Sequence, residues 1–286
     1  MEITVAEESG FCFGVKLAVD SANQALRDNE TIYCLGQLIH NNSVTDDLAD
    51  RGLVVVDNIT DVPDGCKVIF RSHGVAKAVY ETAKAKNLTV IDSTCPFVSK
   101  IHRIVEEHHA KGDKIIIVGK PSHPEVIGIN GWCENCGIIV QSEADLPDLD
   151  DDSQYCVVTQ TTNNQELYHK IIKKIGQNKA ITFDFFDTIC YTTNIRQNEA
   201  KVVSSTSDVM LVLGNKQSAN SNKLLDVCKT NCDASFLIGD MDDLKKLDSS
   251  IFQTDKKVGI TAGASTPYSF IQEVVDFLKA TYSVSV

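Results

Sequence analysis

The stretch DSTCPFVSKIHRI (residues 92–104) determines the fold, because its pattern occurs twice more in the chain. GFCFGVKLAVD (10–20) and DTICYTTNIRQNEA (187–200) also place one cysteine after a short turn and before a segment with the apolar spacing of an amphipathic helix. We therefore expect Cys12, Cys95 and Cys190 at helix N-termini, where the helix dipole favours thiolate over thiol. Each of the three is a candidate metal ligand.

The spacing after each cysteine is the same in all three copies. A glycine follows 24 residues later and a polar residue follows 28 residues later. The glycines end the apolar runs TIYCLG, KIIIVG and VMLVLG, which predicts a buried strand followed by a turn. The pairs of glycine and polar residue are Gly36 with His40, Gly119 with His123, and Gly214 with Ser218.

A second apolar run in each copy ends in small hydroxyl residues, in KVIFRSHG (67–74), YCVVTQTT (155–162) and KVGITAGAS (257–265). This repetition predicts an α/β fold of three pseudo-symmetric units, trefoil-like, around one central site. The predicted units are residues 1–96, 97–190 and 191–286. The opening strand at residues 2–6 is counted with the first unit, although it could pack with another.

Composition narrows the classes of function. The net charge of -12 is spread over the 286 residues, so no nucleic-acid partner is expected. No charged and apolar leader and no apolar run of membrane-spanning length is present in this sequence, so we expect a cytoplasmic protein without a membrane partner. Ten cysteines in such a chain indicate metal binding, redox chemistry or simple burial.

Three cysteines from three units can hold a [4Fe-4S] cluster at three corners and leave the fourth iron open to a substrate oxygen. A tetrahedral zinc site would recruit a fourth ligand, for which His40, His73 or His123 could serve. Three unrelated buried thiols are a further reading, and the repeated spacing argues against it.

Other cysteines and histidines are assigned to the core or the surface. We expect Cys34, Cys66 and Cys156 to be buried in or beside strands. Cys133 and Cys136 form a CxxC pair, for which a zinc or dithiol site stays open. The histidines of the helix predicted over residues 97–112 are expected at the surface: His102, His108 and His109. The final predicted helix, 265–282, is expected to be capped by Ser265 or Thr266.

Polar residues recur at equivalent turns, where imidazole, hydroxyl and amide groups suit a phosphate or diphosphate. Taken singly, each would more often be a helix cap. The six are His40, His73, His123, Ser218, Asn220 and Ser265. Glu125 lies two residues beyond His123, and a carboxyl group in a closed pocket should have a raised pKa and could deliver a proton.

The sequence resembles the hydroxymethylbutenyl diphosphate reductase family, whose members catalyse the last step of the non-mevalonate isoprenoid pathway. The resemblance covers essentially the whole chain. It rests on the motifs GFCFGV, GQLIHN, RSHGV, DSTCPFV, GKPSHPEVIG, TQTT, ICYTTNIRQ, SANSN and TAGASTP. It implies a three-lobed α/β fold around an iron-sulfur cluster.

The resemblance also implies residue roles. Cys12, Cys95 and Cys190 would hold one [4Fe-4S] cluster per subunit, with one iron left open. Glu125 would be the proton donor, and Thr161 and His123 would complete the catalytic group. The substrate-binding set would be His40, His73, His123, Thr161, Thr162, Ser218, Ala219, Asn220 and Ser265. The family usually has a second serine where this chain has Ala219, so only a backbone N–H is available there.

The implied reaction is a reductive dehydration of an allylic diphosphate to isopentenyl and dimethylallyl diphosphates. A ferredoxin or flavodoxin would supply the electrons and would dock at a basic patch that the sequence does not locate. Three alternatives remain. The first is a non-redox iron-sulfur hydro-lyase, which needs no reductant. The second is an iron-sulfur sensor, which needs neither Glu125 nor the anion-binding residues, and the third is a zinc-bound structural protein.

Overall fold

The computed structural model describes residues 1–28, 30–177 and 181–282. Residues 283–286, the end of the third predicted range, lie outside the described part. The chain divides into two compact units. The one-sheet unit comprises Met1–Val15, His40–Val44 and the chain from Tyr191 onward, and the two-sheet unit comprises Lys16–Ile39 and Thr45–Cys190.

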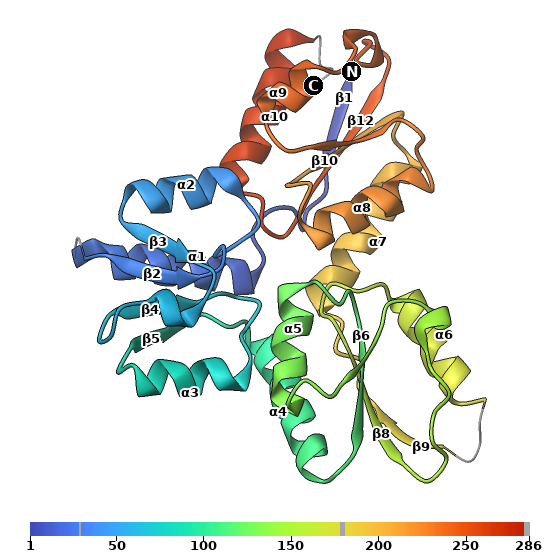
Figure 1. Ribbon diagram of the computed structural model, residues 1–286. Coiled ribbons are helices and arrows are strands. Elements are labelled where there is room, and N and C mark those ends of the chain that lie inside the picture. The colour runs from blue at the N-terminus through green and yellow to red at the C-terminus, as the bar shows by residue number, and fades with distance from the viewer. Residues whose placement is uncertain (29, 178–180, 283–286) are drawn as a thin grey trace. The chain divides into compact units, whose positions relative to one another are not determined.

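Three four-stranded parallel sheets carry the fold (Figure 1). Within the two-sheet unit, the first sheet has the order β3 (Leu53–Val56), β2 (Ile32–Leu35), β4 (Lys67–Phe70), β5 (Thr89–Asp92). The second has the order β7 (Ile138–Val140), β6 (Lys114–Val118), β8 (Gln154–Thr159), β9 (Thr182–Phe185). The sheet of the one-sheet unit has the order β11 (Ser235–Ile238), β10 (Val209–Leu213), β12 (Lys257–Ala262), β1 (Glu2–Val5). The predicted fold class of three α/β repeats is confirmed.

The three sheets have equivalent strand orders, and the strand that precedes a cysteine is an edge strand in each. The opening strand β1 pairs in parallel with β12, with Glu2 opposite Lys257 and Val5 opposite Ile260. It therefore completes the sheet formed by residues of the third predicted range, rather than that of the first. The repeat is thus permuted along the chain, and the ranges 1–96, 97–190 and 191–286 remain a proposed division.

Ten α-helices are described. They are α1 (Phe13–Ala25), α2 (Asn42–Asp50), α3 (Lys77–Ala85), α4 (Pro96–Ala110), α5 (Pro124–Asn130), α6 (Gln165–Ile175), α7 (Tyr191–Ser205), α8 (Ala219–Lys229), α9 (Met241–Lys245) and α10 (Tyr268–Thr281). The short 3-10 helices are η1 (Leu26–Asp28), η2 (Ile59–Asp61), η3 (Gly131–Cys133), η4 (Glu143–Asp145) and η5 (Ser249–Ile251). No described helix is both long and apolar enough to cross a membrane.

The apolar strands are buried on both faces, as expected for parallel sheets with crossover helices. Because side chains alternate along a strand, Leu211 of β10 packs in a core with α10, while Met210 and Val212 pack in a core with α7 and α8. In the second sheet, β6 and β8 divide their side chains in the same way between α6 and the pair α4 and α5. Helices packed on both faces of these sheets therefore hold the central strands and the residues at their ends in place.

Several local predictions were wrong. His102 and His108 of α4 are buried, and His108 Nδ1 lies 2.7 Å from the carboxylate of Asp113. Cys66 is partly exposed, whereas Cys34 and Cys156 are buried as predicted. Pro267 is the N-cap of α10, and no side chain caps this helix by a hydrogen bond. The prediction that Ser265 or Thr266 caps it was therefore wrong.

Candidate active site

Each of Cys12, Cys95 and Cys190 is the last residue before a helix, as predicted: α1, α4 and α7 begin one residue later. Cys95 is the N-cap of α4, and Pro96 occupies the first helical position. Because proline lacks an N–H and its φ is fixed near the helical value, it favours a helix start there. Pro96 therefore places Cys95 at the N-terminus of α4.

The backbone holds the three cysteines in the same way. The N–H of Cys12 donates to the carbonyl of Ala264 at 3.1 Å, two residues after β12 ends. The N–H of Cys95 donates to Ser72 at 3.0 Å, two residues after β4, and that of Cys190 to Thr161 at 2.9 Å, two residues after β8. Each cysteine is thus bound to the strand end that carries the small hydroxyl residues. The sequence repeat corresponds to a repeated contact.

The candidate ligands differ in exposure from the cysteines of the apolar cores, although Cys66 is also partly exposed and Cys136 is exposed. Cys12, Cys95 and Cys190 are partly exposed. Cys156 and Cys228 are fully buried in the cores, and burial raises the pKa of each thiol to about 12. A thiol with such a pKa stays protonated near neutral pH and is a poor metal ligand. The accessible thiols are therefore the ones that suit a metal.

The predicted glycine turns follow β2, β6 and β10 and make equivalent bonds. The N–H groups of Gly36, Gly119 and Gly214 donate to the last residues of the neighbouring strands β3, β7 and β11. Gly36 has a φ of +71°, and a Cβ there would lie 2.4 Å from Arg71 Nη1. A side chain at this position would displace the arginine, so the turn requires glycine.

Glu125 and Thr161 form the centre of the site in the two-sheet unit. Glu125 is only 2% exposed, and its carboxylate accepts the N–H of Thr161 at 2.6 Å and its hydroxyl at 2.7 Å. Burial raises the pKa of Glu125 to about 7, although the bonds from Thr161 lower it. The carbonyl of the same threonine accepts the N–H of Cys190. Thr161 therefore connects Glu125, whose carboxyl group can be protonated near neutral pH, with the candidate metal ligand Cys190.

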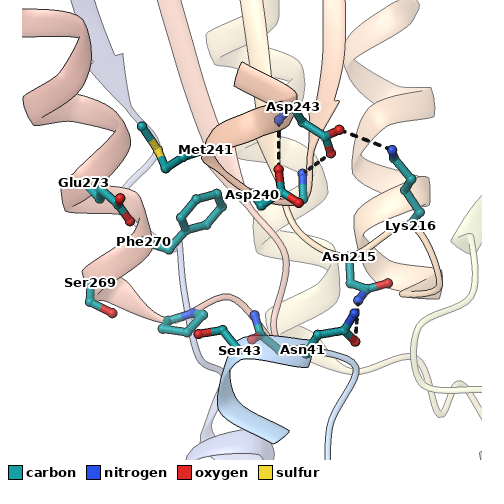
Figure 2. Close-up of a pocket in the computed structure, with 13 residues that line it drawn as sticks. Asn41, Ser43, Asn215, Lys216, Asp240, Met241, Asp243, Ser269, Phe270 and Glu273 are labelled. Atoms are coloured by element: carbon teal, nitrogen blue, oxygen red, sulfur yellow. Dashed lines mark hydrogen bonds and ion pairs between the residues drawn. The ribbon is translucent and has the colours of Figure 1, made fainter. Parts of the chain in front are cut away.

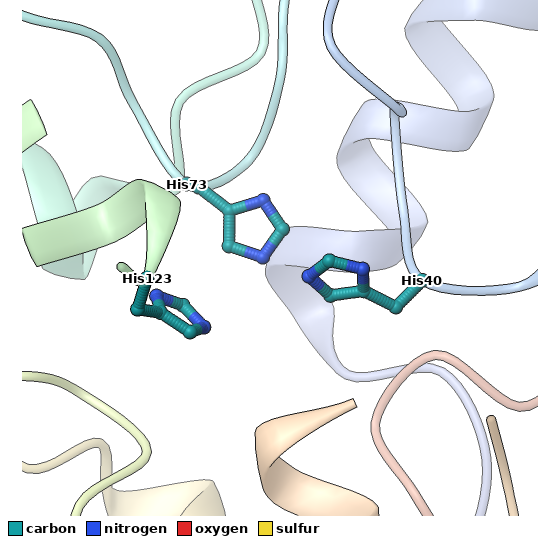
Figure 3. A group of neighbouring side chains, drawn as sticks. All are labelled: His40, His73 and His123. Carbon is teal, nitrogen blue, oxygen red and sulfur yellow. The ribbon is translucent and has the colours of Figure 1, made fainter. Parts of the chain in front are cut away.

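His123 contacts the backbone of Glu125 and also lies close to His73 within the two-sheet unit; Figure 3 shows the two imidazoles. His123 caps α5, and its Nδ1 accepts the N–H of Glu125 at 3.2 Å. A neutral ring with this contact carries its proton on Nε2, which becomes the donor. The ring centroids of His73 and His123 are 5.5 Å apart in an edge arrangement. The imidazoles of His73 and His123 thus lie in one local group.

Gln160 was not singled out from the sequence, although it lies in the TQTT motif. Its Oε1 accepts the N–H of Lys120 at 3.2 Å, and its Nε2 donates to the hydroxyl of Thr162 at 2.8 Å. The buried amide thus connects the turn before His123 to the loop that carries Thr161. Thr162 therefore supports this connection.

In the one-sheet unit, Ser218, Ala219 and Asn220 begin α8. Ser218 is the N-cap and its hydroxyl accepts the N–H of Ser221 at 3.3 Å, and Ala219 is the first helical residue. Asn220 is buried, and its Nδ2 has no hydrogen-bond partner among the described residues. A buried donor without a partner is costly unless a ligand or water accepts from it. The start of α8 therefore suits an anion.

Two further contacts organise this unit. The hydroxyl of Ser265 donates to the carbonyl of His40 at 3.1 Å, which joins two predicted substrate-binding residues. Arg196 is 3% exposed and donates to the carbonyl of Ala262 at the end of β12. Arg196 is not among the site residues predicted from the sequence, although a cation inside the ICYTTNIRQ motif on an amphipathic helix is a usable signal.

A pocket of about 440 Å³ borders these loops in the one-sheet unit (Figure 2). Phe270 and Met241 give it an apolar side, and Asn215 Nδ2 donates to Asn42 Oδ1 at 3.3 Å along its edge. Lys216 lies 3.5 Å from Asp243. The amide contact joins the turn before Ser218 to the start of α2, so it supports the loop geometry.

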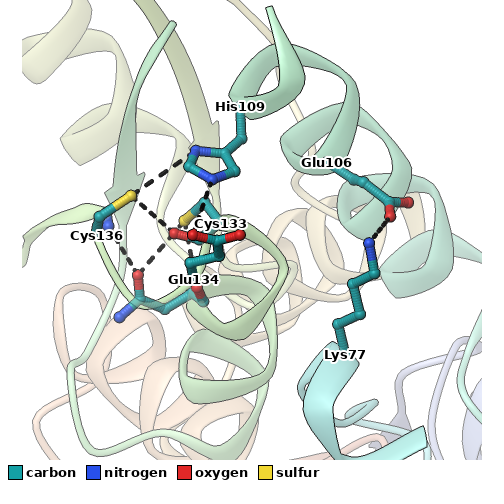
Figure 4. A network of polar contacts seen from close by, with 8 residues as sticks. Lys77, Glu106, His109, Cys133, Glu134 and Cys136 are labelled. Atoms are coloured by element: carbon teal, nitrogen blue, oxygen red, sulfur yellow. Dashed lines mark hydrogen bonds and ion pairs between the residues drawn. The ribbon is translucent and has the colours of Figure 1, made fainter. Parts of the chain in front are cut away.

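The CxxC pair lies in a compact turn, and Cys136 Sγ is 3.8 Å from His109 Nδ1 (Figure 4). Cys133 donates to the carbonyl of Asn130, and Cys136 donates to the carbonyl of Cys133 at 2.8 Å. Burial raises the pKa of Cys133 to about 12. Among the described residues, neither Cys133 nor Cys136 belongs to a group of three or more possible ligand atoms that all lie within 4.8 Å of one another, so the zinc alternative has no geometric support at this turn.

The chain is similar over most of its length to known proteins. A sequence profile described as LytB protein matches residues 3–279. The chain is 44% identical to a 4-hydroxy-3-methylbut-2-enyl diphosphate reductase of Clostridioides difficile, covering 98% of this chain and 99% of the relative. It is also 44% identical to the protein of that name from Alkaliphilus oremlandii, covering 96% of this chain and 98% of the relative.

Solved structures show the same fold. A reductase structure from Plasmodium falciparum matches with a TM-score of 0.89 and 28% identity, covering 99% of this chain and 91% of that protein. A second structure, described as (E)-4-hydroxy-3-methyl-but-2-enyl diphosphate reductase, the terminal enzyme of the non-mevalonate pathway, matches with a TM-score of 0.73 and 33% identity, covering 98% and 99%.

Proposed function

Because the chain belongs to the LytB protein family, we propose that it acts as its named relatives do, as a 4-hydroxy-3-methylbut-2-enyl diphosphate reductase. It is an oxidoreductase of the non-mevalonate isoprenoid pathway. The substrate loses its allylic hydroxyl and gains two electrons and two protons, which gives water and isopentenyl or dimethylallyl diphosphate. The observation within the fold that supports this chemistry best is the buried Glu125 carboxyl group, bound to the residue that also holds Cys190.

The donor set fits an iron-sulfur cluster. Three partly exposed cysteines lie at helix starts, and each makes an equivalent backbone hydrogen bond to a residue just after a strand. In contrast, burial raises the pKa of the Cys156 and Cys228 thiols in the cores, which keeps them protonated. We assign Cys12, Cys95 and Cys190 as the ligands of one [4Fe-4S] cluster per subunit. When bound, the cluster would supply single electrons and one open coordination position for the substrate oxygen.

Residues of the chain would donate the proton and bind the diphosphate. Glu125, whose pKa is raised to about 7, is protonated in part of the molecules near neutral pH and can give its proton to the departing hydroxyl. Thr161 fixes the orientation of this carboxyl group. His40, His73, His123, Ser218, Asn220 and Ser265 would donate to the diphosphate, with the backbone N–H of Ala219 in place of a second serine.

Two further parts of the proposal concern context. Electrons would come from a small carrier protein, a ferredoxin or a flavodoxin. None of the ten cysteines, all of which lie in the described residues, forms a disulfide, and a reducing compartment keeps cysteines in this state. This supports a cytoplasmic location.

Anaerobic assay of the purified protein tests the function. Iron and sulfide content would establish the cluster, and turnover of 4-hydroxy-3-methylbut-2-enyl diphosphate would be followed with and without a low-molecular-weight reductant. We expect product only when the reductant is present. Loss of water from the substrate without a reductant, giving a dehydrated product two hydrogens short of isopentenyl diphosphate, would indicate the hydro-lyase alternative. Tightly bound zinc without iron would contradict the cluster.

A further inference from the structure

The first half of α4 presents an exposed basic and aromatic face directly after Cys95. Phe97 is 45% exposed, and Lys100 and Arg103 are also exposed. Their spacing of three residues places them along one side of the helix, while Val98 and Ile101 are buried on the other side. With a rise of about 1.5 Å per residue, Arg103 lies only about 12 Å along the axis from Cys95. We call the three exposed residues the α4 face.

The charge of the α4 face is unusual for this chain. Residues 95–105 contain no Asp or Glu, although the chain carries a net charge of -12. Neither Lys100 nor Arg103 forms a salt bridge within the described residues. Of the carboxylates on α4, Glu106 is bound by Lys77 at 2.6 Å (Figure 4), and Glu107, four residues after Arg103, forms no salt bridge with it among the described residues. The two cations are therefore available to a partner.

The other helices that begin after a cysteine lack this pattern. In α1, Lys16 is the single cation. In α7, Arg196 is buried and bound to a strand end, and Glu199 precedes Lys201. Only α4 of these three helices combines an exposed aromatic ring with two exposed cations and no acidic residue over its first two turns. An accidental surface charge would not be expected to single out this helix.

We propose that the α4 face docks a small acidic protein that carries one electron at a time. The proposal rests on the proposed function, since a reductase that takes up two electrons needs an external donor. Opposite charge would guide an acidic carrier to the face and fix its orientation, and Phe97 would supply apolar contact at the interface centre. The carrier would then lie next to Cys95. This assigns the basic docking patch to named residues of the chain.

The test compares two double charge reversals in the intact, iron-loaded protein. Lys100→Glu with Arg103→Glu alters the α4 face. Lys170→Glu with Lys173→Glu alters exposed lysines with the same spacing on α6, a helix that does not begin after a cysteine, and changes the net charge equally. The probe is a purified acidic flavodoxin. Its affinity would be measured directly by anaerobic calorimetry at low and high ionic strength, together with turnover driven by flavodoxin and by dithionite.

We expect the α4 reversal to weaken flavodoxin binding about tenfold or more at low ionic strength and to remove most of its salt dependence. The α6 reversal should change affinity much less. Iron content and dithionite-driven turnover should stay at the level of the unaltered protein in both variants. Equal affinity of the α4 variant and the unaltered protein, or equal loss in the two variants, would overturn the docking face. Failure of the proposed function is a separate result, seen as no turnover with dithionite in the unaltered protein.

Discussion

Thr161 makes two hydrogen bonds to the carboxylate of Glu125, one from its N–H at 2.6 Å and one from its hydroxyl at 2.7 Å. Burial raises the pKa of Glu125 to about 7, and these bonds to the charged form act in the opposite direction. The balance between the two effects keeps the carboxyl group able to exchange a proton near neutral pH. Thr161 thus influences both the pKa and the orientation of the Glu125 carboxyl group.

The first prediction is that Thr161→Val shifts the pH dependence of turnover. The variant keeps the backbone N–H but loses the hydroxyl donor, so the pKa of Glu125 should rise by about one unit. Since the acid must be protonated to act, the alkaline limb of the profile should move to higher pH. Thr162→Val is the matched control, because its hydroxyl contacts Gln160 rather than Glu125. An unchanged profile in Thr161→Val would contradict the assignment of Glu125 as the acid.

The repeat of cysteine, glycine and polar residue was predictable from the sequence, because each element recurs at a fixed spacing and local signals mark it. The partner of the opening strand was not predictable, since β1 is only four residues long and has no distinctive side chain. Its pairing with β12 depends on residues more than 250 positions away. The equivalence of the three cysteine contacts appears only once this pairing is known.

The burial of His102 was also not predictable from the sequence. Its ring stacks on Trp132 at 5.1 Å, and the indole N–H donates to the carbonyl of Val75 at 3.0 Å. Gly74, with a φ of +71°, leaves room for the imidazole, because a Cβ there would lie 2.5 Å from it. Three separate segments therefore create this environment. A helical pattern that contains His, Lys and Arg gives no sign of it.

The second prediction concerns stability and pH. Burial lowers the pKa of His102 to about 4, so its contribution to stability is present above pH 6.5 and is lost as the pH falls toward 4. Burial raises the pKa of Glu125, so its contribution is present below pH 4.5 and is lost as the pH rises toward 7. Each effect is on the order of 3 kcal/mol. The two nearly cancel between about pH 4.5 and 6.5.

Single substitutions should therefore reveal opposite slopes. Glu125→Gln should become more stable as the pH rises through this range, and His102→Leu should become less stable. Anaerobic thermal unfolding as a function of pH measures both. His169→Gln, which replaces an exposed histidine of α6, is the control and should follow the unaltered protein. Parallel curves for the two variants would show that these groups do not titrate as their burial implies.

The third prediction separates ligand thiols from structural ones. Cys12→Ser, Cys95→Ser and Cys190→Ser should each lose iron and activity, because a hydroxyl is a poor replacement for thiolate on iron. Cys228→Ala, in the core of the one-sheet unit, should cost stability but retain iron. Iron and sulfide would be measured together with the visible spectrum after anaerobic purification. Equal iron retention in all four variants would remove the three-cysteine assignment.

The last prediction tests whether the start of α8 binds the diphosphate. Ser218→Ala removes the hydroxyl that caps α8, which should cost about 1 kcal/mol of stability. If that hydroxyl also contacts the substrate anion, KM should rise about tenfold or more, while kcat should change little because the anion is held equally in the ground and transition states.

A cap in the two-sheet unit separates these effects. Asn164 caps α6 by accepting the N–H groups of Glu166 and Leu167, so Asn164→Ala should cost similar stability without changing KM. Steady-state kinetics and thermal unfolding would be measured on both variants under the same conditions. If the two variants raise KM equally, the effect in Ser218→Ala reflects lost helix stability. If Ser218→Ala leaves KM unchanged while losing stability, the hydroxyl is only a helix cap and the diphosphate lies elsewhere.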